Sequence, residues 1–193
     1  MVVSLSKGAN VSLLKEVPNL KEVSVGLGWD ARATTGEDFD LDASAFLLKA
    51  DGKVRKDEDF IFYNNLLASD GSVKHAGDDP SGGGEGDNEV IEIYLDEVPP
   101  EITRVAITVT IHDYEKRKQN FGMVSNAYVR VVNLEDGREI ARFDLSEEMG
   151  TETAMIFAEV YRHKNEWKFK AVGQGFSGGL LALCDHFGVD AAE

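Results

Sequence analysis

The chain has 193 residues, and its 20 Lys and Arg against 35 Asp and Glu give a net charge of −15. This charge argues against a nucleic-acid partner, because phosphate contacts need a basic surface. The length fits one domain and the hydrophobic content of 42% is enough for a sizeable core, so we expect a single domain over residues 1–193.

Short strands separated by turn residues dominate the chain. Val23 to Trp29 alternates apolar residues with Ser and Gly, and Val105 to Ile111 alternates strictly, which is the period of a strand. Asp-Gly pairs at residues 51–52, 70–71 and 136–137 mark turns. We predict strands over residues 23–29, 39–48, 60–63, 91–95, 105–111, 127–132, 140–143, 154–161 and 166–171, with residues 8–14 as a further candidate.

One helix is predicted near the end of the chain. Its apolar positions recur at three- and four-residue spacing and a glycine follows as a stop signal: Leu180, Leu181, Leu183, Cys184, Phe187 and then Gly188. A shorter turn or helix is expected near residues 113–118. Many short strands with little helix indicate an all-β fold, a β-sandwich of two mainly antiparallel sheets with a short C-terminal helix.

The compartment follows from what the sequence lacks. Cys184 is the sole cysteine, so no intramolecular disulfide can form, which fits a reducing environment. Residues 1–10 lack the charged and apolar regions of a signal peptide, and no run approaches the ~18 apolar residues of a membrane span. We expect a cytoplasmic protein with no direct membrane insertion.

The segment from Gly77 to Glu89 carries five acidic side chains, one Asn and five Gly, with no Lys, Arg or His. Glycine lets a backbone turn tightly and point its carbonyls inward. Hard oxygen ligands on such a loop suit Ca²⁺, which takes about 6–8 oxygens in loose geometry. From this loop alone, a metal site and a solvated acidic loop are both open.

A second acidic stretch favours the metal. Asp38, Asp40 and Asp42 occur at alternate positions, which would put them on one face of a strand, where like charges repel and a dication would relieve them. Asp30 is placed to join them at the end of its own strand. The spacing excludes an EF-hand, because the residues at its sixth and twelfth positions are Ala43 and Lys49.

Several motifs in one order resemble the TerD family of tellurium-resistance and stress proteins, over nearly the whole chain. They are VGLGWD at 25–30, DFDLDASAFL at 38–47, FYNN at 62–65, DGSV at 70–73, the 77–89 loop, NFG at 120–122, NAYVRVVN at 126–133, TETAMIF at 151–157 and WKFKAVGQGF at 167–176. The resemblance implies a β-sandwich that binds Ca²⁺ through acidic loops, in a bacterial cytoplasmic protein linked to tellurite resistance and general stress.

The resemblance also implies a ligand set and partners. Carried over to this sequence, the ligands are Asp30, Asp40, Asp42, Asp78, Asp79, Glu85, Asp87, Asn88 and Glu89. The implied partners are other TerD-like paralogues or membrane-associated stress proteins. The chain departs from the family pattern at Asp79, Gly83, Glu85 and Asn88, which leaves the affinity and the number of ions open.

Two kinds of function remain in competition. Carboxylates without a nucleophile–base pair favour a non-enzymatic calcium-binding interaction module whose loops are ordered by Ca²⁺. The alternative is a metal-dependent or carboxylate-based hydrolase. Direct reduction of tellurite is disfavoured, because tellurite is an anion and a protein of charge −15 with one cysteine offers neither attraction nor thiols. We interpret Lys116-Arg117-Lys118 as a solvated basic loop.

Overall fold

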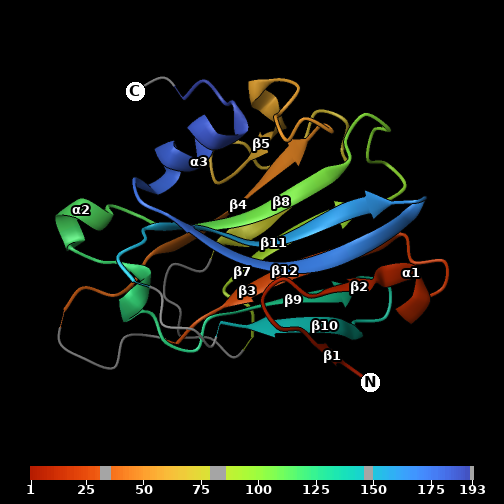
Figure 1. Cartoon of the computed structure of the whole chain (residues 1–193), viewed down its shortest axis with the longest axis horizontal. Helices are drawn as coiled ribbons and strands as arrows, with labels where there is room; N and C mark the ends of the chain where they lie inside the picture. The colour runs from red at the N-terminus through yellow and green to blue at the C-terminus, as the bar shows by residue number, and fades with distance from the viewer. Residues whose placement is uncertain (31–35, 79–85, 146–149, 192–193) are drawn as a thin grey trace.

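Two β-sheets pack face to face in the computed structural model, which describes residues 1–30, 36–78, 86–145 and 150–191 (Figure 1). Sheet A runs in the order β1 (Val3–Ser4), β10 (Glu139–Asp144), β9 (Tyr128–Asn133), β3 (Glu22–Gly28), β7 (Glu89–Tyr94) and β6 (Val73–Asp78). Sheet B runs in the order β2 (Asn10–Ser12), β12 (Glu166–Phe176), β11 (Ala154–His163), β8 (Arg104–Ile111), β4 (Leu41–Leu48) and β5 (Phe60–Ile61).

Neighbouring strands pair antiparallel except for β1 with β10, which confirms the predicted β-sandwich of mainly antiparallel sheets. The alternation of Val23, Val25 and Leu27 turns these side chains inward, and all three are buried. The candidate strand over residues 8–14 is β2, which ends at Ser12, where the one-turn helix α1 (Leu13–Glu16) begins. Strand β6 has no distinct signal in the sequence. Strand β6 pairs with β7, and α1 contacts β12. Tertiary contacts therefore set the conformation of both elements.

The start of β4 corrects one prediction. The strand expected over residues 39–48 begins at Leu41, so Asp38 and Asp40 precede it and do not share a strand face with Asp42. The carbonyls of Glu37 and Asp38 accept hydrogen bonds from the side chains of Gln119 and Arg117, so side chains bind this part of the backbone ahead of the strand. The expected strand at 60–63 also shortens to β5, because Phe62 and Asn65 close a tight turn.

The main core lies between the sheets, and a second cluster lies on the outer face of sheet B. That face is covered by α3 (Gly179–Phe187), which brings Phe187 onto Phe46 with ring centroids 4.5 Å apart. Leu183 and Cys184 are buried with it, and Gly188 ends the helix at φ 79°. The predicted helix is confirmed, except that Leu181 is 55% exposed.

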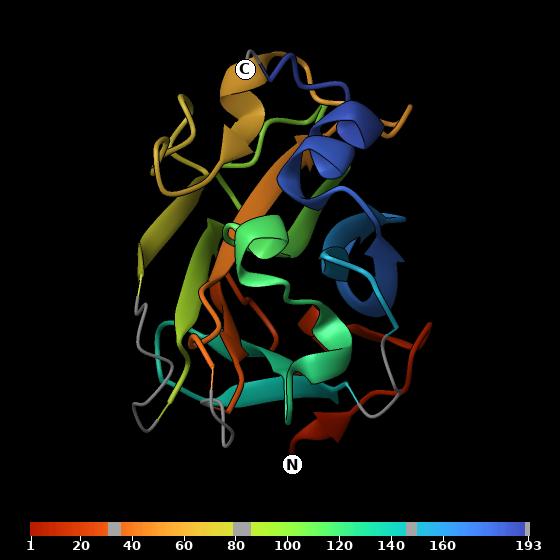
Figure 2. The same ribbon diagram turned by 90° about the vertical axis from the view of Figure 1, so that its left-hand side faces the viewer.

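The remaining helical turns are α2 (Tyr114–Arg117), η1 (Asp57–Asp59) and η2 (Phe121–Met123). Asp113 and Lys118 flank α2 in the left-handed region, with φ of 50° and 52°. Figure 2 shows α2 on the side facing the viewer, below α3. None of the described helices is long and apolar enough to cross a membrane.

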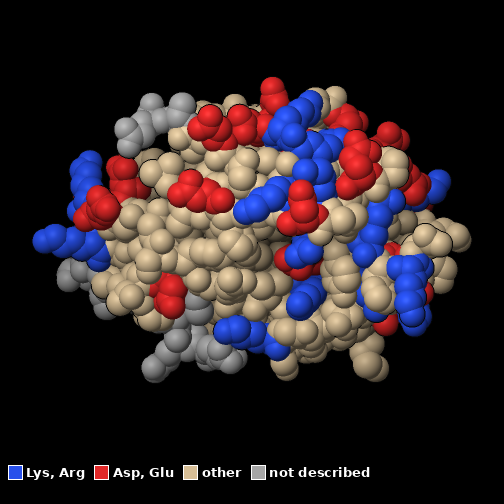
Figure 3. Space-filling view, turned by 45° about the horizontal axis from the view of Figure 1, so that its top comes forward, with Lys and Arg blue, Asp and Glu red and all other residues tan. Residues whose placement is uncertain are grey.

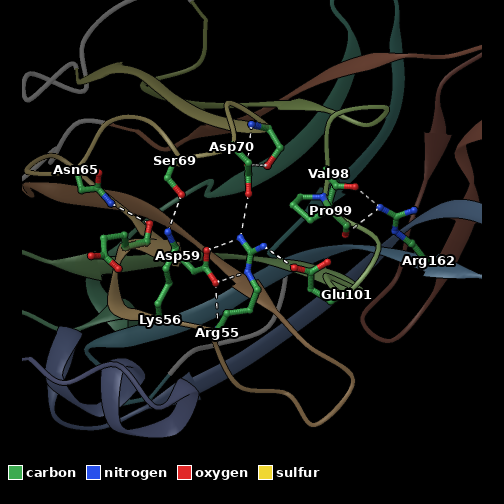
Figure 4. Close-up of polar contacts among 12 residues, drawn as sticks. Arg55, Lys56, Asp59, Asn65, Ser69, Asp70, Val98, Pro99, Glu101 and Arg162 are labelled. Atoms are coloured by element: carbon green, nitrogen blue, oxygen red, sulfur yellow. Dashed lines mark hydrogen bonds and ion pairs between the residues drawn. The ribbon is translucent and has the colours of Figure 1, made fainter.

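An ionic cluster fixes the connections at the far end of β4 (Figure 4). Arg55 donates to Asp59 at 2.7 Å, to Asp70 at 2.9 Å and to Glu101 at 3.1 Å. The Asp59 side chain is 1% exposed, so the guanidinium compensates a carboxylate that has lost its water. Arg55 thereby links the connection between β4 and β5 to the β5–β6 connection, which carries Asp70, and to the β7–β8 connection, which carries Glu101.

Candidate functional site

The acidic segments converge at one end of the sandwich. In the sheet ladder Leu27 of β3 lies opposite Glu89 of β7, and Asp78 of β6 also lies opposite Glu89. The Asn88 side-chain oxygen accepts a hydrogen bond from the Trp29 backbone amide at 3.0 Å, and the Asn88 backbone amide donates to the Leu27 carbonyl at 2.8 Å. Asn88 is therefore tied to the end of β3 from which Asp30 extends.

Glu89 connects the two sheets beneath these segments. Its side chain is 1% exposed, and Oε2 lies 3.1 Å from His75 Nε2 and accepts the Ala43 amide at 3.4 Å. Because Ala43 belongs to β4 of sheet B, the contact fixes the start of β4 against sheet A. His75 is itself buried, at 4% exposure, and is the neighbour of a predicted ligand.

Asp87 lies on the outer face of sheet A. Arg130 Nε donates to its two oxygens at 2.8 and 3.1 Å, and the Tyr128 hydroxyl donates at 2.9 Å. The carboxylate crosses directly over Gly26, where a Cβ would lie 2.0 Å from Oδ2. Burial, together with the charge of Asp87, raises the pKa of Tyr128 to about 12.

Asp40 and Asp42 face the segment around α2. Arg117 Nη2 lies 3.4 Å from Asp40 Oδ2, and Nη1 donates to the Asp38 carbonyl at 3.1 Å. Asp42 Oδ2 lies 3.6 Å from His112 Nδ1. The basic run at 116–118 is therefore not wholly solvated, because Arg117 serves as a counter-ion for the stretch that precedes β4.

Asp30 is exposed, and its carboxylate accepts a hydrogen bond from Asn126 Nδ2 at 2.5 Å. Gln119 binds the 37–38 backbone, donating to the Glu37 carbonyl at 2.8 Å. Its Oε1 is buried and accepts no hydrogen bond from the described residues. Both amide side chains come from the connection between α2 and β9, where the sequence analysis placed no site residue.

The predicted ligands fall into three groups. Asn88 and Glu89 are buried. Asp30 is exposed and Asp40 and Asp42 are partly exposed, whereas Asp87 forms an ion pair with Arg130. Asp79 and Glu85 lie outside the described residues, as does the side chain of Asp78. Within the described ranges no group of three His, Cys, Asp or Glu side chains is arranged to hold a metal ion.

The donors fit calcium in kind, since they are carboxylate and amide oxygens. A complete site would need further donors from outside the described residues, where Asp79 and Glu85 lie. The arginine contacts were missed because alternating strand residues carry no partner information. One signal did exist: Gly26 and Gly28 fall within the apolar strand predicted over residues 23–29, and a glycine in a strand often marks the close approach of another group. Asp87 covers the first, and the Tyr128 ring covers the second.

The family model and the relatives place the chain in a class of tellurium-resistance and stress-response proteins. The TerD domain matches residues 1–187, and the chain belongs to the TerD family. It is 59% identical over 192 residues to tellurium resistance protein TerD of Serratia marcescens, covering all of both chains.

Two further comparisons agree with this assignment. General stress protein 16U of Bacillus subtilis (strain 168) is 50% identical over 190 residues, which is 98% of each chain. The crystal structure of a homologue of telluride resistance protein (TerD) from Streptomyces coelicolor A3(2) superposes with a TM-score of 0.69 at 27% identity. It covers 91% of this chain and 100% of that one.

Proposed function

We propose that this chain is a non-enzymatic, cytoplasmic calcium-binding module of a bacterial stress response linked to tellurite resistance. In this proposal Ca²⁺ neutralises the acidic segments and orders them into a surface that other TerD-like proteins or membrane-associated stress proteins recognise. The observation that carries the proposal is the pair of contacts from Asn88 to Trp29 and from Glu89 to Ala43. They bring Asn88 and Glu89 against the ends of β3 and β4, where Asp30 and Asp42 lie.

The arrangement favours a binding role over hydrolysis. A carboxylate hydrolase needs two acids that face one substrate across a short gap. Here Asp87 lies on the outer face of sheet A against Arg130, and Asp40 lies against Arg117. A cation could draw Asp40 away from its arginine contact, which is long at 3.4 Å, more easily than it could draw Asp87 from a contact of 2.8 Å. We therefore expect Asp40 to contribute more to calcium binding than Asp87.

The test is thermal unfolding followed by Trp fluorescence in chelator, in Ca²⁺ and in excess Mg²⁺. Trp29 is a suitable reporter because its amide binds Asn88. A ligand at a hundredfold excess over its Kd stabilises the native state by about 2.7 kcal/mol, which corresponds to roughly 5–10 °C for a chain of this length. We expect that shift with Ca²⁺ and not with Mg²⁺.

Matched variants locate the site. Asp42→Asn should reduce the calcium shift, whereas Asp96→Asn should leave it unchanged. Asp96 is exposed and follows the opposite end of β7. Equal calcium shifts in both variants, or no shift in the parent protein at millimolar Ca²⁺, would contradict the proposed site.

A further inference from the structure

The C-terminal helix leaves an apolar ridge uncovered on the outer side of sheet B. Leu181 is 55% exposed and Leu180 is half-buried, although the other apolar positions of α3 pack into the second cluster. Two hollows of about 430 and 390 Å³ flank this ridge, and both are lined by Leu180 and Leu181. We call the ridge and its two hollows the α3 groove.

Aromatic and aliphatic side chains line both sides of the α3 groove. Tyr63 and Tyr114 line the larger hollow, and Phe60, Phe62 and Val189 line the smaller one. The Phe62 and Tyr63 rings meet edge to face with centroids 5.1 Å apart, and Tyr63 is 44% exposed. A surface of this kind fits apolar anchor side chains, since aromatic walls provide large contact areas at low conformational cost.

The charges that line the groove are mainly of one sign. Five carboxylates line the two hollows against a single ammonium group, that of Lys116; they are Asp42, Asp57, Asp113, Glu115 and Asp190. Figure 3 views the molecule from this side and shows a broad tan area bordered by red side chains on its left half. Blue side chains gather in a band on the right and at the left edge. The apolar floor therefore has a negative rim.

We propose that the α3 groove docks a basic amphipathic segment of a partner protein, with apolar side chains in the two hollows and Lys or Arg side chains against the acidic rim. Helical segments of this composition bind apolar grooves through residues spaced by one turn. A second copy of this chain is a poorer occupant, because its charge of −15 would be repelled. An anionic membrane surface is disfavoured for the same reason.

The α3 groove is a second interaction surface, separate from the calcium-ordered surface of the proposed function, and it does not require calcium. Of the residues that line it, Asp42 alone belongs to the predicted ligand set. Peptide binding is therefore measured in chelator, separately from the calcium melt. If the melt shows no calcium shift and the peptide still binds, the calcium proposal fails alone; the reverse result would overturn the groove alone.

The probe is a fluorescent peptide of about five helical turns, with Leu on one face and Lys on the other. Its control peptide keeps every Leu and replaces Lys with Glu. We expect fluorescence anisotropy to show binding of the Leu–Lys peptide and at least tenfold weaker binding of the Leu–Glu peptide. Equal binding of both peptides would overturn the proposed charge complementarity.

Variants of the full chain test whether the peptide binds in the α3 groove. Leu181→Ser and Tyr63→Ser should each weaken binding of the Leu–Lys peptide about tenfold, the size expected for the loss of one buried apolar anchor. Leu67→Ser is the matched control, because Leu67 is 53% exposed and does not line either hollow. It should change the affinity less than twofold. Unchanged binding in both groove variants, or equal loss in all three, would overturn the proposal. Circular dichroism melts of the three variants, each changed at an exposed residue, should match the melt of the parent protein and so show that they fold.

Discussion

Replacing Gly26 with Ala tests how Asp87 is used. The added Cβ would lie 2.0 Å from Asp87 Oδ2 and 2.2 Å from its Cγ, so the carboxylate has to move. It would then lose the contacts from Arg130 and from the Tyr128 hydroxyl. Because Asp87 has a short side chain, it cannot keep these partners from a shifted position.

The magnitude follows from these contacts. Hydrogen bonds to charged groups contribute about 1.5–3 kcal/mol each, but Arg130 is 29% exposed and regains part of its hydration. Ala in place of Gly in a strand interior returns about 0.5–1 kcal/mol. We expect a net loss of about 2 kcal/mol in the free energy of unfolding, or roughly 4–8 °C in Tm.

The assay is urea unfolding of four proteins: the parent, Gly26→Ala, Asp87→Ala and the double variant. If Gly26→Ala acts by displacing the carboxylate, it should cost nothing in the Asp87→Ala background and could stabilise it by about 0.5–1 kcal/mol. Additive losses would refute the reasoning, as would a Gly26→Ala protein as stable as the parent.

Four further outcomes are expected. Arg55→Met should cost about 3–5 kcal/mol, because it leaves Asp59 charged and buried; urea unfolding measures it. Burial alone would raise the pKa of Asp70, but hydrogen bonds from Ser72 and Arg55 outweigh it and lower that pKa. Its stabilisation should therefore be lost as pH falls below about 4, with a smaller loss in Arg55→Met. The pKa of Tyr128, raised to about 12, should cause stability to fall as pH rises from about 10 to about 12, and absorbance titration of Tyr128→Phe should lack the last tyrosine step. Burial raises the pKa of Cys184 to about 11, so a thiol reagent at pH 8 should label it only as fast as the protein unfolds; rapid labelling of the native state would contradict this.

The periodicity of the sequence was sufficient for most of the strands and for the C-terminal helix, because both depend on which face is buried. It failed where side chains from a distant segment bind the backbone. Arg117 and Gln119 contact residues 37–40, β4 begins at Leu41, and Asp40 does not share a strand face with Asp42. Residues far apart in sequence meet across strands, and no local pattern carries the pairing of Asp87 with Arg130.

Counter-ions divide the acidic residues into two sets, and the division bears on function. Asp87 has a short, two-oxygen contact with Arg130 and a tyrosine donor, so its charge is already compensated and serves the outer face of sheet A. Asp40 has a long contact of 3.4 Å with Arg117. A charge compensated this weakly gains most from a bound dication.

Asp42 also links the two proposals, because it lines the α3 groove as well as the proposed calcium site. A cation bound there would remove one of the negative charges that attract a basic segment. Calcium should therefore weaken docking of the basic segment by reducing its electrostatic attraction to the groove, while the apolar contacts at Leu181 and Tyr63 persist. Thermodynamic linkage requires the reverse effect to be equal, so a docked basic segment would lower calcium affinity by the same factor. Calcium and the basic segment would then each weaken the binding of the other, and this coupling needs no movement of the sandwich itself.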